Sequence, residues 1–179
     1  RAAGAKVFDI GLCGTEMVYF ATTELQAGGG IMVTASHNPM DYNGMKLVRE
    51  NAIPISADTG LQDLASMVLA FQEDNVDKLG GYQEVDIHDA YVNKILSFVD
   101  TNLIKPLKVV VNGGNGCAGP FFDKIAQNLP IEVVRINHEP DGTFPNGIPN
   151  PMLLENRKVT SDAVIAHKAD LGIAWDGDF

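Results

Sequence analysis

Short apolar runs alternate along the chain with longer segments in which apolar residues recur at helical spacing. The short runs, which are rich in β-branched residues, predict strands at 6–10, 31–34, 45–48, 107–111, 131–136 and 171–175. The longer segments predict helices at 14–27, 58–71, 89–103, 120–128 and 153–169. This alternation is typical of α/β proteins, so we expect layered mixed or parallel sheets flanked by helices.

The pattern breaks once, at Lys105-Pro106, between an expected helix and an expected strand. We therefore expect two consecutive, similar α/β domains, at 1–104 and 105–179. The chain starts at Arg1 without an initiator methionine and stops just after an expected strand. We interpret both ends as cuts and expect a fragment of a longer protein.

The composition of the chain disfavours nucleic acids and membranes as binding partners. The 179 residues include 13 Lys and Arg against 23 Asp and Glu, a formal net charge of −10, and an acidic surface disfavours nucleic-acid binding. No apolar run approaches the roughly 20 residues of a membrane span, which disfavours a membrane partner. The two cysteines, Cys13 and Cys117, are far apart in the sequence and fit a reducing, cytoplasmic location.

The segment T-A-S-H-N-P at 34–39 is the first candidate for chemistry. It follows an expected strand, and ligands of α/β proteins bind at strand ends. Ser36 is a candidate for a covalent group, while His37 and Lys46 are candidates for neutralising charge or moving protons. The residues alone equally allow a tight turn closed by Pro39, with a surface histidine.

The second candidate is Asp176-Gly177-Asp178, which follows the last expected strand. Two carboxylates at this spacing suit a hard cation such as Mg²⁺ or Ca²⁺. A solvated Asp-Gly turn is the alternative, and the residues alone favour it.

The third candidate is the glycine-rich segment 114–119, which has the G-x-G-x-x-G spacing of a dinucleotide site. Such a site needs an acidic residue at the end of the next strand, but Glu139 lies beyond that end, and Pro120 follows the last glycine directly. A tight structural turn is favoured, and a dinucleotide-binding module stays as the alternative.

Together these motifs resemble the α-D-phosphohexomutases, in particular their bacterial phosphomannomutase/phosphoglucomutase branch. The segment 34–39, with the N-G-x-K that ends at Lys46, is similar to the family's phosphoserine loop. The segment 141–151 is similar to a loop of the second domain, and the D-G-D that starts at Asp176 is similar to the start of the metal loop D-G-D-x-D-R.

The resemblance implies an isomerase that moves phosphate between O1 and O6 of a hexose, using Mg²⁺ and a bisphosphorylated intermediate. It implies that Ser36 is the phosphorylated residue, with His37 and Lys46 also catalytic. Asn38 and Arg49 would lie in the phosphate region. Ser36, Asp176 and Asp178 would bind the metal, and the third aspartate of the metal loop would lie beyond Phe179.

The resemblance favours mannose phosphates as substrates, with glucose or glucosamine phosphates as the alternatives. It also implies further domains, which recognise the sugar, so we expect this chain to be inactive alone. A non-catalytic remnant that keeps only the fold is a further alternative.

Overall fold

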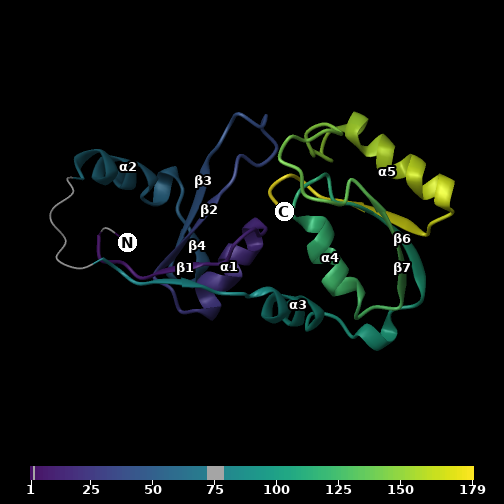
Figure 1. The fold of residues 1–179 in the computed structure, drawn as a ribbon, viewed down its shortest axis with the longest axis horizontal. Coiled ribbons are helices and arrows are strands. Elements are labelled where there is room, and N and C mark those ends of the chain that lie inside the picture. The colour runs from purple at the N-terminus through teal and green to yellow at the C-terminus, as the bar shows by residue number, and fades with distance from the viewer. Residues whose placement is uncertain (2, 72–78) are drawn as a thin grey trace. The chain divides into compact units, whose positions relative to one another are not determined.

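The computed structural model describes residue 1, residues 3–71 and residues 79–179 (Figure 1). These residues form two compact units. The first unit comprises Arg1–Cys13, Met17–Met32 and Lys46–Ile87, and the second comprises Gly14–Glu16, Val33–Met45 and His88–Phe179. Since each unit draws on separate stretches of the sequence, the predicted boundary at residue 104 stays a prediction.

The first unit is built on two small sheets. Strand β1 (Val7–Asp9) pairs in parallel with β5 (Tyr82–Glu84), and the second sheet has the order β2 (Gly29–Val33), β3 (Met45–Arg49) and β4 (Ile53–Pro54). Strands β3 and β4 are antiparallel, so the molecule combines parallel and antiparallel pairing.

Two helices accompany these sheets, α1 (Thr15–Glu24) and α2 (Leu61–Ala70). Helix α1 packs closely on β2, because a Cβ added at Gly30 would meet the side chains of Val18 and Thr22. In contrast, the apolar stripe predicted for α2 is largely solvent-exposed: Met67 is 66% exposed and Val68 73%.

The second unit has a single parallel sheet with the order β7 (Ile131–Ile136), β6 (Leu107–Asn112) and β8 (Leu171–Ala174). Helices α4 (Ala118–Ala126) and α5 (Leu154–His167) cover opposite faces of this sheet, and α3 (His88–Leu96) precedes it (Figure 1). The central strand alternates between the two faces. Val109 and Val111 pack with Phe122 of α4, whereas the Asn112 amide donates a hydrogen bond to Thr160 of α5.

The α/β class predicted from the sequence is confirmed, and each predicted strand and helix has an observed counterpart. The helix predicted at 89–103 is too long, since α3 ends at Leu96 and a short 3₁₀ turn occupies Thr101–Leu103. Gly29 and Gly30, which lie between the helix predicted at 14–27 and the strand predicted at 31–34, begin β2. Strands β4 and β5 were not predicted. Among the described residues, no helix combines the length and apolar character needed to span a bilayer.

Candidate functional site

Ser36 lies in the loop between β2 and β3, which we define as residues 34–44 and call the Ser36 loop. Its backbone is held at both ends: the Thr34 amide donates to the Gly44 carbonyl at 3.0 Å, and the Ser36 amide donates to the Thr34 hydroxyl at 2.9 Å. Ser36 adopts a left-handed conformation with φ +56°, which is uncommon outside glycine and concentrates at functional sites. The loop therefore presents this hydroxyl in one defined direction.

The turn that follows β8, residues 175–178, is here called the Asp176 turn. The Trp175 amide donates to the Asn112 carbonyl at 3.3 Å, and the Gly177 amide donates to the Pro149 carbonyl at 3.1 Å. Glycine is required at 177, because an added Cβ would lie 2.5 Å from the Ser36 carbonyl oxygen. This close approach brings the Ser36 loop and the Asp176 turn together within the second unit.

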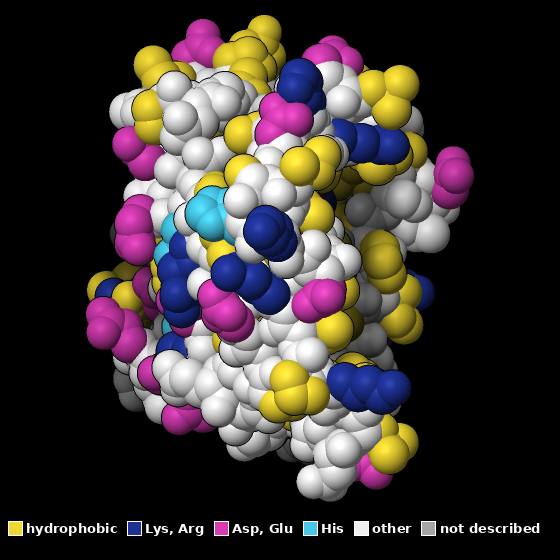
Figure 2. Space-filling view, turned by 90° about the vertical axis from the view of Figure 1, so that its right-hand side faces the viewer, with side chains coloured by type: hydrophobic (Ala, Val, Ile, Leu, Met, Phe, Trp, Pro, Cys, Tyr) yellow, Lys and Arg dark blue, Asp and Glu magenta, His cyan; other side chains and the backbone are white. Residues whose placement is uncertain are grey.

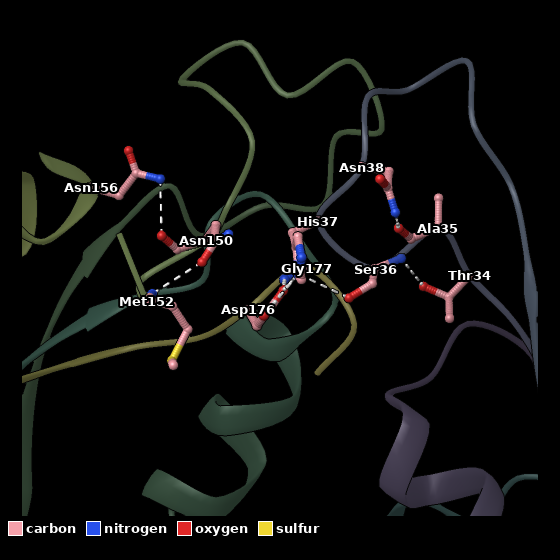
Figure 3. Close-up of polar contacts among 10 residues, drawn as sticks. All are labelled: Thr34, Ala35, Ser36, His37, Asn38, Asn150, Met152, Asn156, Asp176 and Gly177. Carbon is pink, nitrogen blue, oxygen red and sulfur yellow. Dashed lines mark hydrogen bonds and ion pairs between the residues drawn. The ribbon is translucent and has the colours of Figure 1, made fainter. Parts of the chain in front are cut away.

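The side chains of Ser36, His37 and Asp176 point toward one another (Figure 3). The Nδ1 atom of His37 lies 3.1 Å from the Ser36 hydroxyl oxygen and 3.1 Å from the nearer carboxylate oxygen of Asp176. Because one ring nitrogen contacts both partners, the three residues do not form a relay through the two sides of the imidazole. The His37 side chain is 45% exposed and that of Asp176 30%, so the group is open to a ligand.

The other predicted site residues divide between the units. Asn38 lies in the Ser36 loop, where its amide nitrogen donates to the Ala35 carbonyl at 2.7 Å. Asp178 lies in the Asp176 turn, and its carbonyl accepts from the Thr15 amide at 3.1 Å. Lys46 and Arg49 belong to β3 in the first unit, where Lys46 is half-buried and Arg49 exposed.

The glycine-rich segment 114–119 is occupied by close contacts within the chain. The Asn115 amide donates to the Asn137 carbonyl at 2.7 Å, and a Cβ on Gly119 would clash with the His138 backbone. A Cβ on Gly114 would likewise clash with Pro149. The glycines thus allow the chain to pack against itself, which supports the structural turn.

Two family models match the chain. Phosphoglucomutase/phosphomannomutase α/β/α domain I matches residues 1–72, and α/β/α domain II of the same family matches residues 89–179. The chain belongs to the phosphoglucomutase/phosphomannomutase family. The predicted membership of the phosphohexomutases is therefore confirmed.

Relatives and solved structures within the family agree. The chain is 59% identical over 179 residues to a protein of Xanthomonas campestris pv. campestris (strain B100) named "Phosphohexose mutases", covering 100% of this chain and 40% of the relative. It is 54% identical over 184 residues to a phosphomannomutase of Salmonella typhimurium, covering 99% and 40% respectively. The crystal structure of a phosphoglucomutase/phosphomannomutase family protein from Burkholderia thailandensis matches with a TM-score of 0.87 at 36% identity, covering 99% of this chain and 39% of the other. The chain thus spans about 40% of the length of these phosphohexomutase relatives.

Sequence reasoning did not list two residues that shape this candidate site. The Thr34 hydroxyl accepts a hydrogen bond from the Ser36 amide. This contact has a local signal in the sequence, because a threonine hydroxyl often bonds to the backbone amide two residues later in such a turn. Pro149, whose carbonyl holds Gly177, has no such signal, since 28 positions separate the two residues. Only the folded chain shows this second contact.

The surface around the second unit has mixed charge. On the face shown in Figure 2, Lys and Arg side chains lie among Asp and Glu side chains, with hydrophobic side chains between them. Within the second unit, Asp123 pairs with Arg135 at 2.9 Å and with His138 at 3.0 Å. Burial raises the pKa of the Asp123 carboxyl, but these two hydrogen-bond donors lower it more, so the net pKa lies below its usual value.

Proposed function

We propose that the protein represented by this chain is a phosphomannomutase-type phosphohexomutase that interconverts hexose 1-phosphate and hexose 6-phosphate, with mannose phosphates favoured. The observation that carries the proposal is the left-handed Ser36, whose hydroxyl meets His37 and Asp176. Similarity to phosphomannomutases also supports a metabolic isomerase, and the absence of a disulfide between the described residues Cys13 and Cys117 fits a cytoplasmic location.

In this proposal Ser36 carries a phosphoryl group between two hydroxyls of one sugar. Phosphoserine gives its phosphoryl group to the free O1 or O6 of a hexose monophosphate, which yields a bisphosphate and a serine hydroxyl. The serine then takes the phosphoryl group from the other end of the sugar. Phosphoryl transfer depends chiefly on positioning and charge neutralisation, and the fixed backbone of the Ser36 loop provides the positioning.

We assign a divalent metal, Mg²⁺, to the Ser36 hydroxyl and to the carboxylates of Asp176 and Asp178. The chemistry of the donors fits, because hydroxyl and carboxylate oxygens are hard ligands, and Gly177 lets the two loops approach closely. When bound, the metal would neutralise charge on the phosphoryl oxygens. Among the residues described, no three His, Cys, Asp or Glu side chains form a metal cluster, so we expect weak Mg²⁺ binding by this chain alone.

The remaining roles follow the sequence motif. His37 would hold or move a proton at the Ser36 oxygen, which its Nδ1 atom contacts. Lys46 would offset negative charge near the transferred phosphoryl group. Asn38 and Arg49 would contact the phosphate region.

The decisive experiment replaces Ser36 in the full-length protein. Ser36→Ala should lower turnover of mannose 1-phosphate at least about 10³-fold, because the phosphoryl carrier is lost. Ser97→Ala is the matched control, since the Ser97 hydroxyl donates to the Lys94 carbonyl of α3, away from the Ser36 loop in the sequence. Intact mass and peptide mapping should place one phosphate on Ser36. Full activity of Ser36→Ala, or a phosphate found only elsewhere, would refute the assignment.

Two further assays define the substrate and the active unit. Mannose, glucose and glucosamine 1-phosphates compared at equal concentration identify the preferred sugar. The 179-residue chain alone should show no mutase activity, because it spans about 40% of its relatives. Robust conversion by this chain would show that the site does not need the remaining residues.

A further inference from the structure

The second unit contains a cavity of about 200 Å³ that the proposed mutase reaction does not use. It lies at the carboxyl ends of β6 and β8, where Asn112 and Ala174 line it. Helix α4 leads from β6 to β7, whereas α5 leads from β7 back past β6 to β8. The chain direction across the sheet therefore reverses between β6 and β8, and ligands of open α/β sheets bind at this switch point.

Three asparagines of the cavity wall use their amide groups in the same way. The amide nitrogen of Asn137 donates to Asn112 at 3.2 Å, that of Asn146 to Asn115 at 2.9 Å, and that of Asn156 to the Asn150 carbonyl at 2.9 Å. Within residues 1, 3–71 and 79–179, the side-chain oxygens of Asn137, Asn146 and Asn156 have no hydrogen-bond donor. One of the two N–H donors of each amide is thus used inside the protein, and the acceptor oxygens are left for a ligand.

The charge of the lining selects against phosphates. The lining includes no Lys, Arg or His, and its one charged side chain is the carboxylate of Glu155. Ile148 and Val159 add apolar surface. A small cavity with several acceptors, apolar walls and no cation suits an uncharged molecule that carries several hydroxyl donors.

We propose that this cavity is a binding site for a small, uncharged polyhydroxyl molecule. The site is distinct from the mutase site, because Ser36, His37, Asp176 and Asp178 do not line it. The two sites are adjacent, however, because Pro149 contacts both of them. Pro149 lines the cavity, and its carbonyl accepts the Gly177 amide beside Asp176 at 3.1 Å (Figure 3 shows Gly177 and Asp176).

Titration of the 179-residue chain with myo-inositol, followed by ¹H–¹⁵N NMR, tests the proposal. Saturable shifts are expected for the side-chain amides of Asn137, Asn146 and Asn156 and for the Gly177 amide. Asn156→Leu should weaken binding about 3- to 10-fold, because one acceptor is lost. Val159→Phe should abolish saturable binding by filling the cavity. Asn128→Leu is the matched control, since the Asn128 amide donates to the Lys124 carbonyl at the end of α4, and it should bind like the original chain.

One further arm separates this proposal from the mutase proposal, and two more test other occupants of the cavity. Ser36→Ala should bind myo-inositol unchanged, so the result stands apart from the fate of the mutase proposal. Absence of saturable shifts, or equal binding by the original chain, Asn156→Leu and Val159→Phe, overturns the proposal. Saturation of the same amides by inorganic phosphate or by ammonium chloride, without response to myo-inositol, overturns it as well.

Discussion

The two units differ in how completely their sheets are covered, although their hydrophobic patterns are similar. In the second unit, three parallel strands form one sheet with helices on both faces. In the first unit, the strands divide between a sheet of two and a sheet of three. A largely apolar cavity of about 760 Å³ lies in this unit, with lining residues from β1, α1, β2 and α2.

As a consequence, some apolar side chains of the first unit are more exposed to solvent than those of the central strand of the second unit. Val110 and Val111 of β6 are 0% exposed, whereas Ile31 of β2 is 59% exposed and Val68 of α2 is 73% exposed. All four are β-branched residues in regular elements. The periodicity of a sequence therefore identifies the apolar side chains that one face of an element presents. Whether those side chains are buried depends on which other elements pack against that face.

The largest contrast is expected for two phenylalanines. Phe122 is 8% exposed and packs with Val109 and Val111, whereas Phe71 at the end of α2 is 56% exposed. Phe122→Ala should lower the free energy of unfolding by about 3–5 kcal/mol, because it leaves a cavity in the core. Phe71→Ala should change it by less than about 0.5 kcal/mol.

Urea unfolding followed by circular dichroism measures both changes. The exposed Phe71 serves as the control for loss of an aromatic ring as such. Equal destabilisation by the two variants would mean that the first unit buries Phe71 in solution, and it would remove the contrast between the units.

A smaller effect is expected from the buried polar contact of the second unit. The Asn112 amide donates to the Thr160 hydroxyl at 3.0 Å, and both residues are buried. Thr160→Val keeps the shape but leaves the amide without this acceptor, which should cost about 1–3 kcal/mol. Thr23→Val is the matched control, because the exposed Thr23 hydroxyl donates to the Tyr19 carbonyl one turn earlier in α1. A cost below that of the control would show that water replaces Thr160.

The same comparison explains what the sequence was able to predict of the fold. Strand β7 was predicted at its observed bounds, because its apolar run is long and ends at clear turn signals. Strands β4 and β5 were missed, because they are two and three residues long and depend on pairing with β3 and β1. So short a strand carries little periodicity of its own, and β1, which is also three residues long, was recognised because the predicted run at 6–10 extends beyond it.

The candidate site was predictable to a similar extent. The residue types and their order indicated Ser36 and Asp176, because each lies in a short motif of side chains that can carry or bind a reacting group. The left-handed backbone of Ser36 was not predictable, because a serine rarely adopts this conformation. The approach of Gly177 to Ser36 was not predictable either, because 141 positions of sequence separate the two residues. The roles of Lys46 and Arg49 stay predictions.

Asp123 of α4 should contribute less to the free energy of unfolding than the Asn112–Thr160 contact, and its contribution should depend on pH. Its folded pKa is lowered, so its stabilising effect is complete above the unfolded pKa of about 3.8 and disappears as the pH falls through the folded value. Asp123→Asn should cost about 1 kcal/mol at neutral pH, a modest figure because the side chain is partly exposed. It should cost progressively less below about pH 4. Thermal unfolding across pH measures this, with Asp162→Asn in the exposed Lys158 pair as control. A cost that is independent of pH would exclude the ion-pair explanation.

The smallest effect is expected in the first unit, at the link between its β1–β5 strands. The Tyr82 hydroxyl donates to the Asp9 carboxylate at 2.7 Å, and this hydrogen bond, more than any other contact, raises the pKa of Tyr82 to about 12. Because the folded pKa exceeds the ordinary value of 10, the contribution to stability is complete below about pH 10 and disappears as the pH approaches 12. Tyr82→Phe should remove one tyrosinate from the uppermost part of an ultraviolet absorbance titration. If Tyr82 instead titrates at its ordinary value, the hydroxyl does not hold Asp9 in solution, and the contrast between a covered second unit and a loosely tied first unit becomes sharper still.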